Sequence, residues 1–164
     1  MISEYIIKTY NRILSIIKYI GWKILFGCKL SKGYNTFFYP GCKMMIERSG
    51  KIKIGNSCFF NYNCSFTSLG HIVIGNQCIF GENVKIYDHN HKCTFDGTPF
   101  RSQGYEIGSV EIGSNVWIGS NTIILPNVKI GDNVIIAAGS IITKCVESNS
   151  VLIQKRQSTV VKYE

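Results

Sequence analysis

The sequence predicts an all-β protein built as a parallel β-helix of six-residue repeats. Six isoleucines recur at intervals of six residues without a break: Ile112, Ile118, Ile124, Ile130, Ile136 and Ile142. An α-helix requires apolar spacing near 3.6 and a strand requires 2, so a period of six fits neither alone. It fits stacked coils of short flat segments, in which each hexad places one large side chain in a continuous core.

A second series supports the same fold. The position four residues after each isoleucine is small or β-branched, as an inner corner requires, and is held by Val116, Thr122, Val128, Val134 and Ser140. Gly113, Gly119 and Gly131 directly follow three of the isoleucines, where a sharp bend can use the conformational freedom of glycine.

The ladder also runs upstream. Two further sets are spaced by six and are offset from each other by two residues, which indicates a short insertion near residues 68–71: Ile54, Phe60 and Phe66, then Ile74, Phe80 and Ile86. Cys58, Cys64 and Cys78 occupy small inner positions and are expected to fill the core. Many unpaired cysteines indicate a reducing cytoplasm, and the absence of CxxC spacing predicts no metal site.

The repeat stops between Ile86 and Ile112. The intervening loop, residues 88–108, is polar and aromatic and holds two of the three histidines. Long loops in a regular scaffold usually carry function. Phe95, Phe100 and Tyr105 can stack on a sugar or simply anchor the loop.

Residues 1–30 form a helical segment ahead of the β-helix domain, 31–148, and a C-terminal tail, 149–164. Apolar residues in 2–26 recur at threes and fours, and Lys8, Arg12, Lys18 and Lys23 interrupt them. No run is long enough to cross a membrane. The segment is expected either to cap the β-helix or to lie on the inner membrane as a basic amphipathic helix, and the two roles can coexist.

The net charge of +8 suggests an anionic partner or serves solubility alone. The basic residues are scattered and no nucleic-acid motif occurs, so no nucleic-acid partner is expected.

Residues 112–144 carry a more specific pattern. The stretch IGSNVWIGSNTIILPNVKIGDNVIIAAGSIITK resembles the hexapeptide-repeat acetyltransferases, and in particular galactoside and maltose O-acetyltransferases. IYDHNHK and PFRSQG resemble the branch that acetylates capsular and lipopolysaccharide sugars. The resemblance implies a left-handed β-helix with a protruding loop, a homotrimer, and acetyl-CoA bound as co-substrate at subunit boundaries.

The resemblance also implies site residues near the acceptor. His91 matches the catalytic histidine, which as a neutral imidazole can deprotonate a hydroxyl. His89 is its neighbour and can contact the acceptor, and Asp88 can orient an imidazole. Asn61 matches the asparagine that binds the acceptor, although an asparagine here can also serve a left-handed turn.

A second group matches positions that serve acetyl-CoA. Trp117 corresponds to the tryptophan near the CoA arm, and Ser120 to the residue whose backbone N–H faces the oxyanion. Ala138, Thr143 and Lys144 match further CoA contacts. The family's GNPAR-like ending is replaced here by QKRQST, in which Lys155 and Arg156 are the available cations.

These features predict an acetyl-CoA-dependent O-acetyltransferase. Its acceptor would be a bacterial surface saccharide, free or carried on a lipid. N-acetylation of an amino sugar is the alternative, and a non-catalytic scaffold or a metal-dependent carbonic anhydrase using His71, His89 and His91 is disfavoured.

Overall fold

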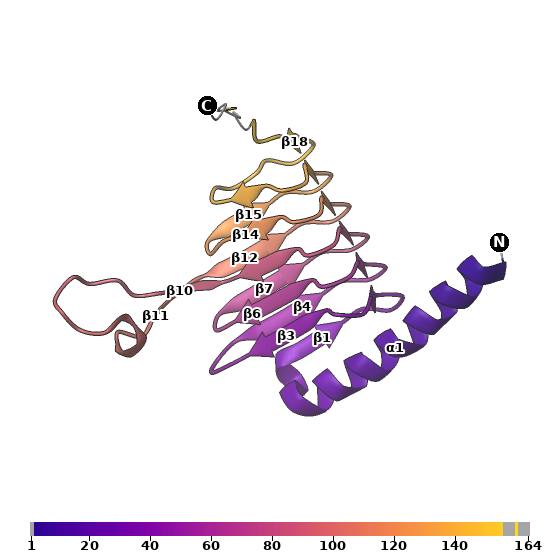
Figure 1. Cartoon of the computed structure of the whole chain (residues 1–164), viewed down its shortest axis with the longest axis horizontal. Coiled ribbons are helices and arrows are strands. Elements are labelled where there is room, and N and C mark those ends of the chain that lie inside the picture. The colour runs from indigo at the N-terminus through magenta and orange to yellow at the C-terminus, as the bar shows by residue number, and fades with distance from the viewer. Residues whose placement is uncertain (1, 156–159, 161–164) are drawn as a thin grey trace, which may run out of the picture.

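The computed structural model describes residues 2–155 and residue 160. It is a left-handed parallel β-helix preceded by one long helix, α1 (Ile2–Phe26), and a short 3₁₀ turn, η1 (Gly27–Lys29). Each coil passes through three sheets that run up the molecule (Figure 1). No helix in the described part of the chain is long and apolar enough to cross a membrane.

Three parallel sheets make the walls. Sheet 1 contains β1 (Leu30–Lys32), β4 (Lys51–Ile54), β7 (His71–Ile74), β12 (Ser109–Ile112) and β15 (Val128–Ile130). Sheet 2 contains β2 (Phe37–Phe38), β5 (Phe59–Phe60), β8 (Ile79–Phe80), β13 (Trp117–Ile118), β16 (Ile135–Ile136) and β18 (Val151–Leu152). Sheet 3 contains β3 (Lys43–Ile46), β6 (Ser65–Ser68), β9 (Lys85–Tyr87), β14 (Ile123–Ile124) and β17 (Ile141–Ile142).

The pairing register confirms the repeat and its offset. Ile112 pairs with Ile130, so this coil takes 18 residues, or three hexads. Ile54 pairs with Ile74, and that coil takes 20 residues. The two additional residues fall in the region where the sequence pattern shifts by two.

The predicted ladder positions form the core. All six isoleucines from Ile112 to Ile142 are buried, as are Cys58, Cys64 and Cys78 at the inner corners. Along sheet 2, the rings of Phe38 and Phe60 stack with centroids 4.8 Å apart, and those of Phe60 and Phe80 stack at 4.5 Å. Stacking identical positions in successive coils thus turns a sequence period into one continuous apolar column.

The corners bend through residues with positive φ. In the corner between sheets 1 and 2 (the 1–2 corner), each turn residue directly precedes an inner small residue: Asn35, Ser57, Gln77, Asn115, Asn133 and Asn149. The corner between sheets 2 and 3 (the 2–3 corner) uses Gly41, Asn63, Asn83, Asn121 and Gly139 in the same way. The left-handed conformation is disfavoured for most L-residues, and asparagine and glycine adopt it at the lowest cost.

Helix α1 closes the N-terminal end of the core. Trp22 packs edge-on against Phe38 with centroids 5.1 Å apart and joins the buried cluster. The Ser15 hydroxyl accepts a hydrogen bond from the Phe38 N–H at 2.7 Å, and the Asn11 amide donates to the Tyr62 hydroxyl at 3.0 Å. The helix therefore covers an otherwise open edge, as its capping role requires.

The structure shifts the expected limits of the β-helix slightly. The first coil begins at Leu30, within the expected helical segment, and β18 adds a strand at Val151–Leu152, beyond the expected boundary at residue 148. Half of the expected tail, including Arg156, lies outside the described residues.

The corner geometry generates the first prediction. Asn133 has φ +57°. Its side-chain Nδ2 donates to Asn149 Oδ1, and its side-chain Oδ1 accepts from Asn115 Nδ2. Asn133→Val loses these bonds and strains the turn, so it should lower the free energy of unfolding by about 2–3 kcal/mol. Asn133→Gly loses the same bonds without the strain, and chemical denaturation should find it the more stable variant of the two. Equal losses would show that backbone conformation is not the constraint.

Candidate active site

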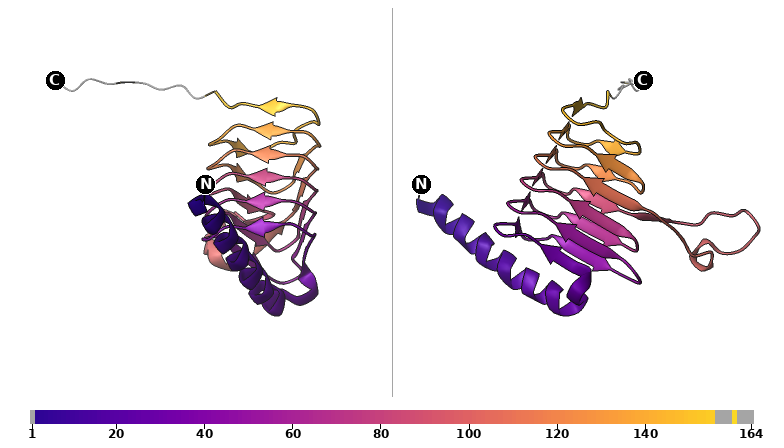
Figure 2. Two further views of the ribbon diagram at one scale, coloured as in Figure 1. Left: turned by 90° about the vertical axis from the view of Figure 1, so that its right-hand side faces the viewer. Right: turned by 180° about the vertical axis from the view of Figure 1, so that it is seen from behind.

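A hairpin leaves the β-helix at the corner between sheets 3 and 1 (the 3–1 corner). Its strands β10 (His89–His91) and β11 (Tyr105–Ile107) pair antiparallel, and a loop with a short 3₁₀ turn, η2 (Phe100–Ser102), joins them. The hairpin projects far from the coils (Figures 1 and 2). The chain then returns to β12, so the insertion leaves the stacking register of sheet 1 intact.

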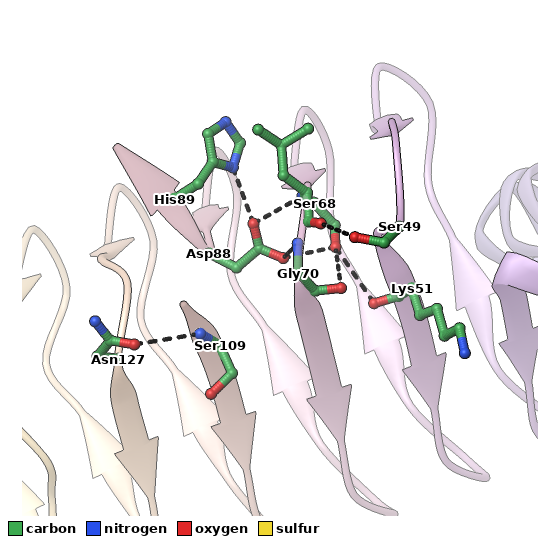
Figure 3. A network of polar contacts seen from close by, with 9 residues as sticks. Ser49, Lys51, Ser68, Gly70, Asp88, His89, Ser109 and Asn127 are labelled. Carbon is green, nitrogen blue, oxygen red and sulfur yellow. Dashed lines mark hydrogen bonds and ion pairs between the residues drawn. The ribbon is translucent and has the colours of Figure 1, made fainter. Parts of the chain in front are cut away.

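Asp88 anchors the base of this hairpin. Its carboxylate is fully buried and accepts hydrogen bonds from the Ser68 hydroxyl at 2.6 Å, the Leu69 N–H at 2.9 Å and the Gly70 N–H at 3.0 Å (Figure 3). These donors satisfy the oxygens of a carboxylate that solvent does not reach.

His89 is the fourth partner of this carboxylate. Its Nδ1 lies 2.9 Å from Asp88 Oδ1, and its side chain is mostly covered (Figure 3). Because three other donors already point at this carboxylate, it is best placed to accept from His89 as well, and in the tautomer that donates from Nδ1 the Nε2 atom carries the lone pair. The expected orienting role of Asp88 is therefore directed at His89.

His91 has different surroundings. Its exposed ring lies 4.5 Å from the Tyr105 ring, which also contacts His89 with centroids 5.4 Å apart. Both histidines thus contact Tyr105, as expected if positions two apart in an extended segment point the same way. His91, Tyr105 and four further loop residues line a cavity of about 640 Å³: Lys92, Cys93, Phe100 and Arg101.

The residues expected to serve acetyl-CoA fall at two places. Ser120 and Ala138 occupy successive coils of the 2–3 corner, with exposed Trp117 just before it and Asn61 two coils below Ser120. Thr143 and Lys144 are exposed at the 3–1 corner, in register with Tyr87 and Asp88 and two coils above them. Coil spacing near 4.8 Å places them about 10 Å along the axis from Asp88.

A single chain therefore does not bring the candidate groups together. His89 and His91 lie at the 3–1 corner. Trp117, Ser120 and Ala138 lie at or just before the 2–3 corner, at the opposite ends of the strands of sheet 3. The candidate residues therefore form two separate clusters, one at the hairpin and one at the 2–3 corner.

Asn61 does not serve the left-handed turn that the sequence left open for it. The residue with positive φ at this corner is Asn63, while the Asn61 side-chain oxygen accepts the Tyr62 N–H at 2.9 Å. The acceptor-binding role of Asn61 stays a prediction.

The Ser120 backbone N–H occupies a break in a ladder of hydrogen bonds. At the 1–2 corner a backbone N–H of each coil donates to a side-chain oxygen of the next coil. The Asn56 N–H donates to Asn76 Oδ1 and the Asn76 N–H to Ser114 Oγ. The Ser114 N–H donates to Asp132 Oδ1 and the Asp132 N–H to Ser148 Oγ. At the 2–3 corner the Glu82 N–H donates to Ser120 Oγ in this way. The next oxygen is missing because Ala138 stacks on Ser120, so within the described residues this N–H has no acceptor and can bind an oxyanion.

Residues not identified from the sequence complete the site. Ser68 and Arg48 come from the two coils below the hairpin, and the Arg48 guanidinium carbon lies 5.3 Å from the Tyr105 ring centroid. Neither has a local sequence signal, because each reaches the site through coil stacking. In the part of the chain that the structure describes, no three His, Cys, Asp or Glu side chains converge as metal ligands would.

Comparison with known proteins identifies the family. The model of the bacterial transferase hexapeptide (six repeats) matches residues 109–144. A protein of Dictyostelium discoideum named as an acetyltransferase is 33% identical over 141 residues, which cover 85% of this chain and 70% of that protein. The chain belongs to the hexapeptide-repeat acetyltransferases.

Two solved structures resemble the chain in fold and sequence. A maltose O-acetyltransferase from Clostridium difficile is 34% identical, with a TM-score of 0.59 over 72% of this chain and 64% of that one. A galactoside acetyltransferase in complex with coenzyme A is 31% identical, with a TM-score of 0.66 over 75% and 59%. The chain spans 58% and 50% of the lengths of acetyltransferases from Schizosaccharomyces pombe and Staphylococcus aureus.

The Asp88 environment generates the second prediction. Asp88→Asn replaces one acceptor oxygen with an NH₂ group that faces donors, so it should lower the free energy of unfolding by about 1–3 kcal/mol. Asp96→Asn is the matched control, because the exposed Asp96 carboxylate bonds only within its own turn, to Thr94 and Thr98. Denaturant titration should show a smaller loss for the control. An unchanged Asp88→Asn protein would exclude the anchoring role.

Proposed function

We propose that this protein transfers the acetyl group of acetyl-CoA to a hydroxyl of a bacterial surface saccharide, such as a precursor of capsule, exopolysaccharide or lipopolysaccharide. The observation that supports this proposal is a pair of partial sites: the hairpin that carries His89 and His91 at the 3–1 corner, and the Ser120 N–H at the 2–3 corner, which has no acceptor among the described residues. One half can take a proton and the other can hold negative charge, as direct acyl transfer requires.

His91 is proposed as the general base, following its match to the family's catalytic histidine. Its imidazole removes the proton of the acceptor hydroxyl while that oxygen attacks the thioester carbon. The Ser120 N–H stabilises the resulting oxyanion. The C–S bond then breaks, and the imidazolium returns the proton to the departing CoA thiolate. His89, held by Asp88, presents Nε2 toward the acceptor and orients it, together with Asn61.

A homotrimer is proposed because it brings the two halves together. Each boundary would join the hairpin of one subunit to Trp117, Ser120 and Ala138 of the next. Lys144, exposed near the hairpin, supplies a point charge for a CoA phosphate. Four buried, unpaired thiols and the use of acetyl-CoA favour the cytoplasm as the compartment.

The third prediction separates the two loop histidines. His91→Ala should lower kcat for acetyl transfer about 100-fold or more, because loss of a general base typically costs 10² to 10⁴. His89→Ala should lower it less, and His71→Ala, which removes an exposed side chain from sheet 1, should leave it unchanged. Thiol release from acetyl-CoA measures all three. If His89→Ala lowers kcat more than His91→Ala does, the general base is His89, the imidazole bound to Asp88, and not His91.

The fourth prediction concerns the Ser120 N–H. Ala138→Ser restores the missing oxygen of the ladder and occupies this N–H, so kcat should fall about 10-fold or more, as removal of an oxyanion donor implies. Ala137→Ser is the control, because Ala137 stacks on Gly119 rather than on Ser120.

Mixed trimers test the boundary directly. Co-expressed Ala138→Ser and His91→Ala chains should regain activity that neither possesses alone, because one boundary type then carries both intact residues. No recovery from mixed trimers verified by mass spectrometry would place the whole site in one subunit.

Helix α1 is proposed to rest on the inner membrane surface in addition to capping the core. One stripe of the helix carries uncharged, exposed side chains and points away from the face that packs on the coils: Ile6, Tyr10, Ile13, Ile17, Ile20 and Ile24. An exposed apolar stripe of this length on a protein of net charge +8 suits the interface of an anionic membrane. A lipid-carried saccharide would be met at that surface.

The helix cations contribute less than the sequence suggests. Lys18 donates to the Cys42 carbonyl oxygen, Lys23 donates to the Gly27 and Leu30 carbonyl oxygens, and the Arg12 guanidinium lies over Phe37. These side chains are directed at the β-helix and its edge. Membrane binding should therefore depend mainly on the apolar stripe.

The fifth prediction tests the stripe with the cap intact. The triple variant Ile13→Ser, Ile17→Ser and Ile20→Ser retains Trp22, so its melting temperature and its activity on a soluble glycan should change little. Its binding to vesicles of phosphatidylglycerol should fall about tenfold or more, since each buried aliphatic side chain contributes 1.5–3 kcal/mol.

The control replaces three apolar side chains elsewhere that are still more exposed, Tyr34, Phe95 and Ile153, with serine. In a vesicle flotation assay the control variant should still float with the vesicles, whereas the stripe variant should not. If the wild-type protein does not float, and the stripe variant instead lowers the mass measured by sedimentation, the stripe binds another copy of α1.

A further inference from the structure

The hairpin cavity has a composition that the proposed reaction alone does not require. Acetyl transfer to a hydroxyl needs a base at the acceptor, and His91 lines the cavity in that role. The lining also includes two cations, Lys92 and Arg101, and no carboxylate. Neither cation takes part in an ion pair among the described residues.

A third cation approaches the same wall from the β-helix. Arg48 lies over the ring of Tyr105, the cavity residue that also contacts both histidines. The Lys29 amine donates to the Arg48 carbonyl oxygen at 2.6 Å and tethers this corner. Three cationic side chains are therefore arranged around the aromatic wall of one cavity.

The nearby carboxylates are directed elsewhere. Asp96 accepts hydrogen bonds from Thr98 and Thr94 within its own turn. Glu106 follows Tyr105 on β11, so strand alternation turns its side chain to the opposite face of the hairpin. The positive charge of the cavity is thus left available to a ligand.

We propose that the acceptor is an acidic saccharide, whose carboxylate or phosphate is bound by Arg101 and Lys92 while its hydroxyl lies at His91. The planar guanidinium of Arg101 matches either anion through paired hydrogen bonds, and Lys92 adds a point charge. Phe100 and Tyr105 offer aromatic faces to the pyranose. This inference rests on the proposed function and adds the charge class of its substrate.

The test compares three ligands that differ only in the group at C6, which is neutral in methyl glucoside and anionic in methyl glucuronide and methyl glucoside 6-phosphate. Saturation-transfer NMR without acetyl-CoA should show the two anions binding about 10-fold more tightly than the neutral sugar, with the preference declining as salt is raised. The glucuronide and the phosphate arms show which anion the cavity favours. Equal binding of all three would overturn the proposal.

Variants assign the preference to the cavity. Arg101→Gln should lower the affinity for the two anions about 10-fold and leave the affinity for the neutral sugar unchanged. Lys8→Gln is the control, because it also removes one positive charge, but from an exposed side chain on α1. It should retain the full preference for the anions over the neutral sugar. If Arg101→Gln instead raises only the KM for acetyl-CoA, the cations serve CoA phosphates and the proposal is wrong. Binding without any acetyl transfer would count against the proposed function and leave this inference standing.

Discussion

The rest of the structure depends on the left-handed backbone conformation at the corners of each coil. A flat segment must turn sharply and then rejoin the coil below at the same register, and at the 1–2 and 2–3 corners one residue with positive φ makes this turn. The inner residue that follows must be small, because the corner brings the chain close to the core. Val116, Thr122 and Cys58 hold such positions and are buried. Corner conformation and core packing are therefore two consequences of one constraint.

The same constraint explains where function can reside. The strands of successive coils must keep their register to stack, so additional residues are tolerated only at corners, where the chain can leave and return between paired strands. The hairpin does so between β9 and β12, and buried Asp88 holds its base through four donors. A rigid scaffold thus positions an extended loop whose own sequence is free to carry chemistry.

The ladder of corner hydrogen bonds shows how a single side chain affects this scaffold. The 1–2 corner continues from coil to coil because Asn76, Ser114, Asp132 and Ser148 each supply an oxygen. The 2–3 corner stops at Ala138, and the N–H that loses its partner belongs to Ser120. A methyl group in place of a hydroxyl converts a structural donor into one that is available to a ligand.

Helix α1 distributes its side chains in the reverse of the usual amphipathic pattern. The face against the β-helix includes Asn11, Ser15 and Lys18, which satisfy exposed backbone and side-chain groups of the first coils. Trp22 of this helix is buried in the core, and Tyr19 and Phe26 are partly buried against it. The isoleucine stripe faces outward, so the apolar spacing that identified the helix does not identify its packing surface.

The sequence by itself determined the stacked-coil architecture, because a six-residue apolar period fits neither an α-helix nor a single strand but does fit repeated coils. Local spacing also located the interrupting loop and the core cysteines, and the resemblance of residues 112–144 indicated the family. Only the tertiary structure decided that Asp88 supports His89, that Arg48 reaches Tyr105, and that Ser120 and His91 lie at different corners. These relations join residues in different coils or at opposite edges of a sheet, and their distances depend on how the coils stack rather than on separation along the chain.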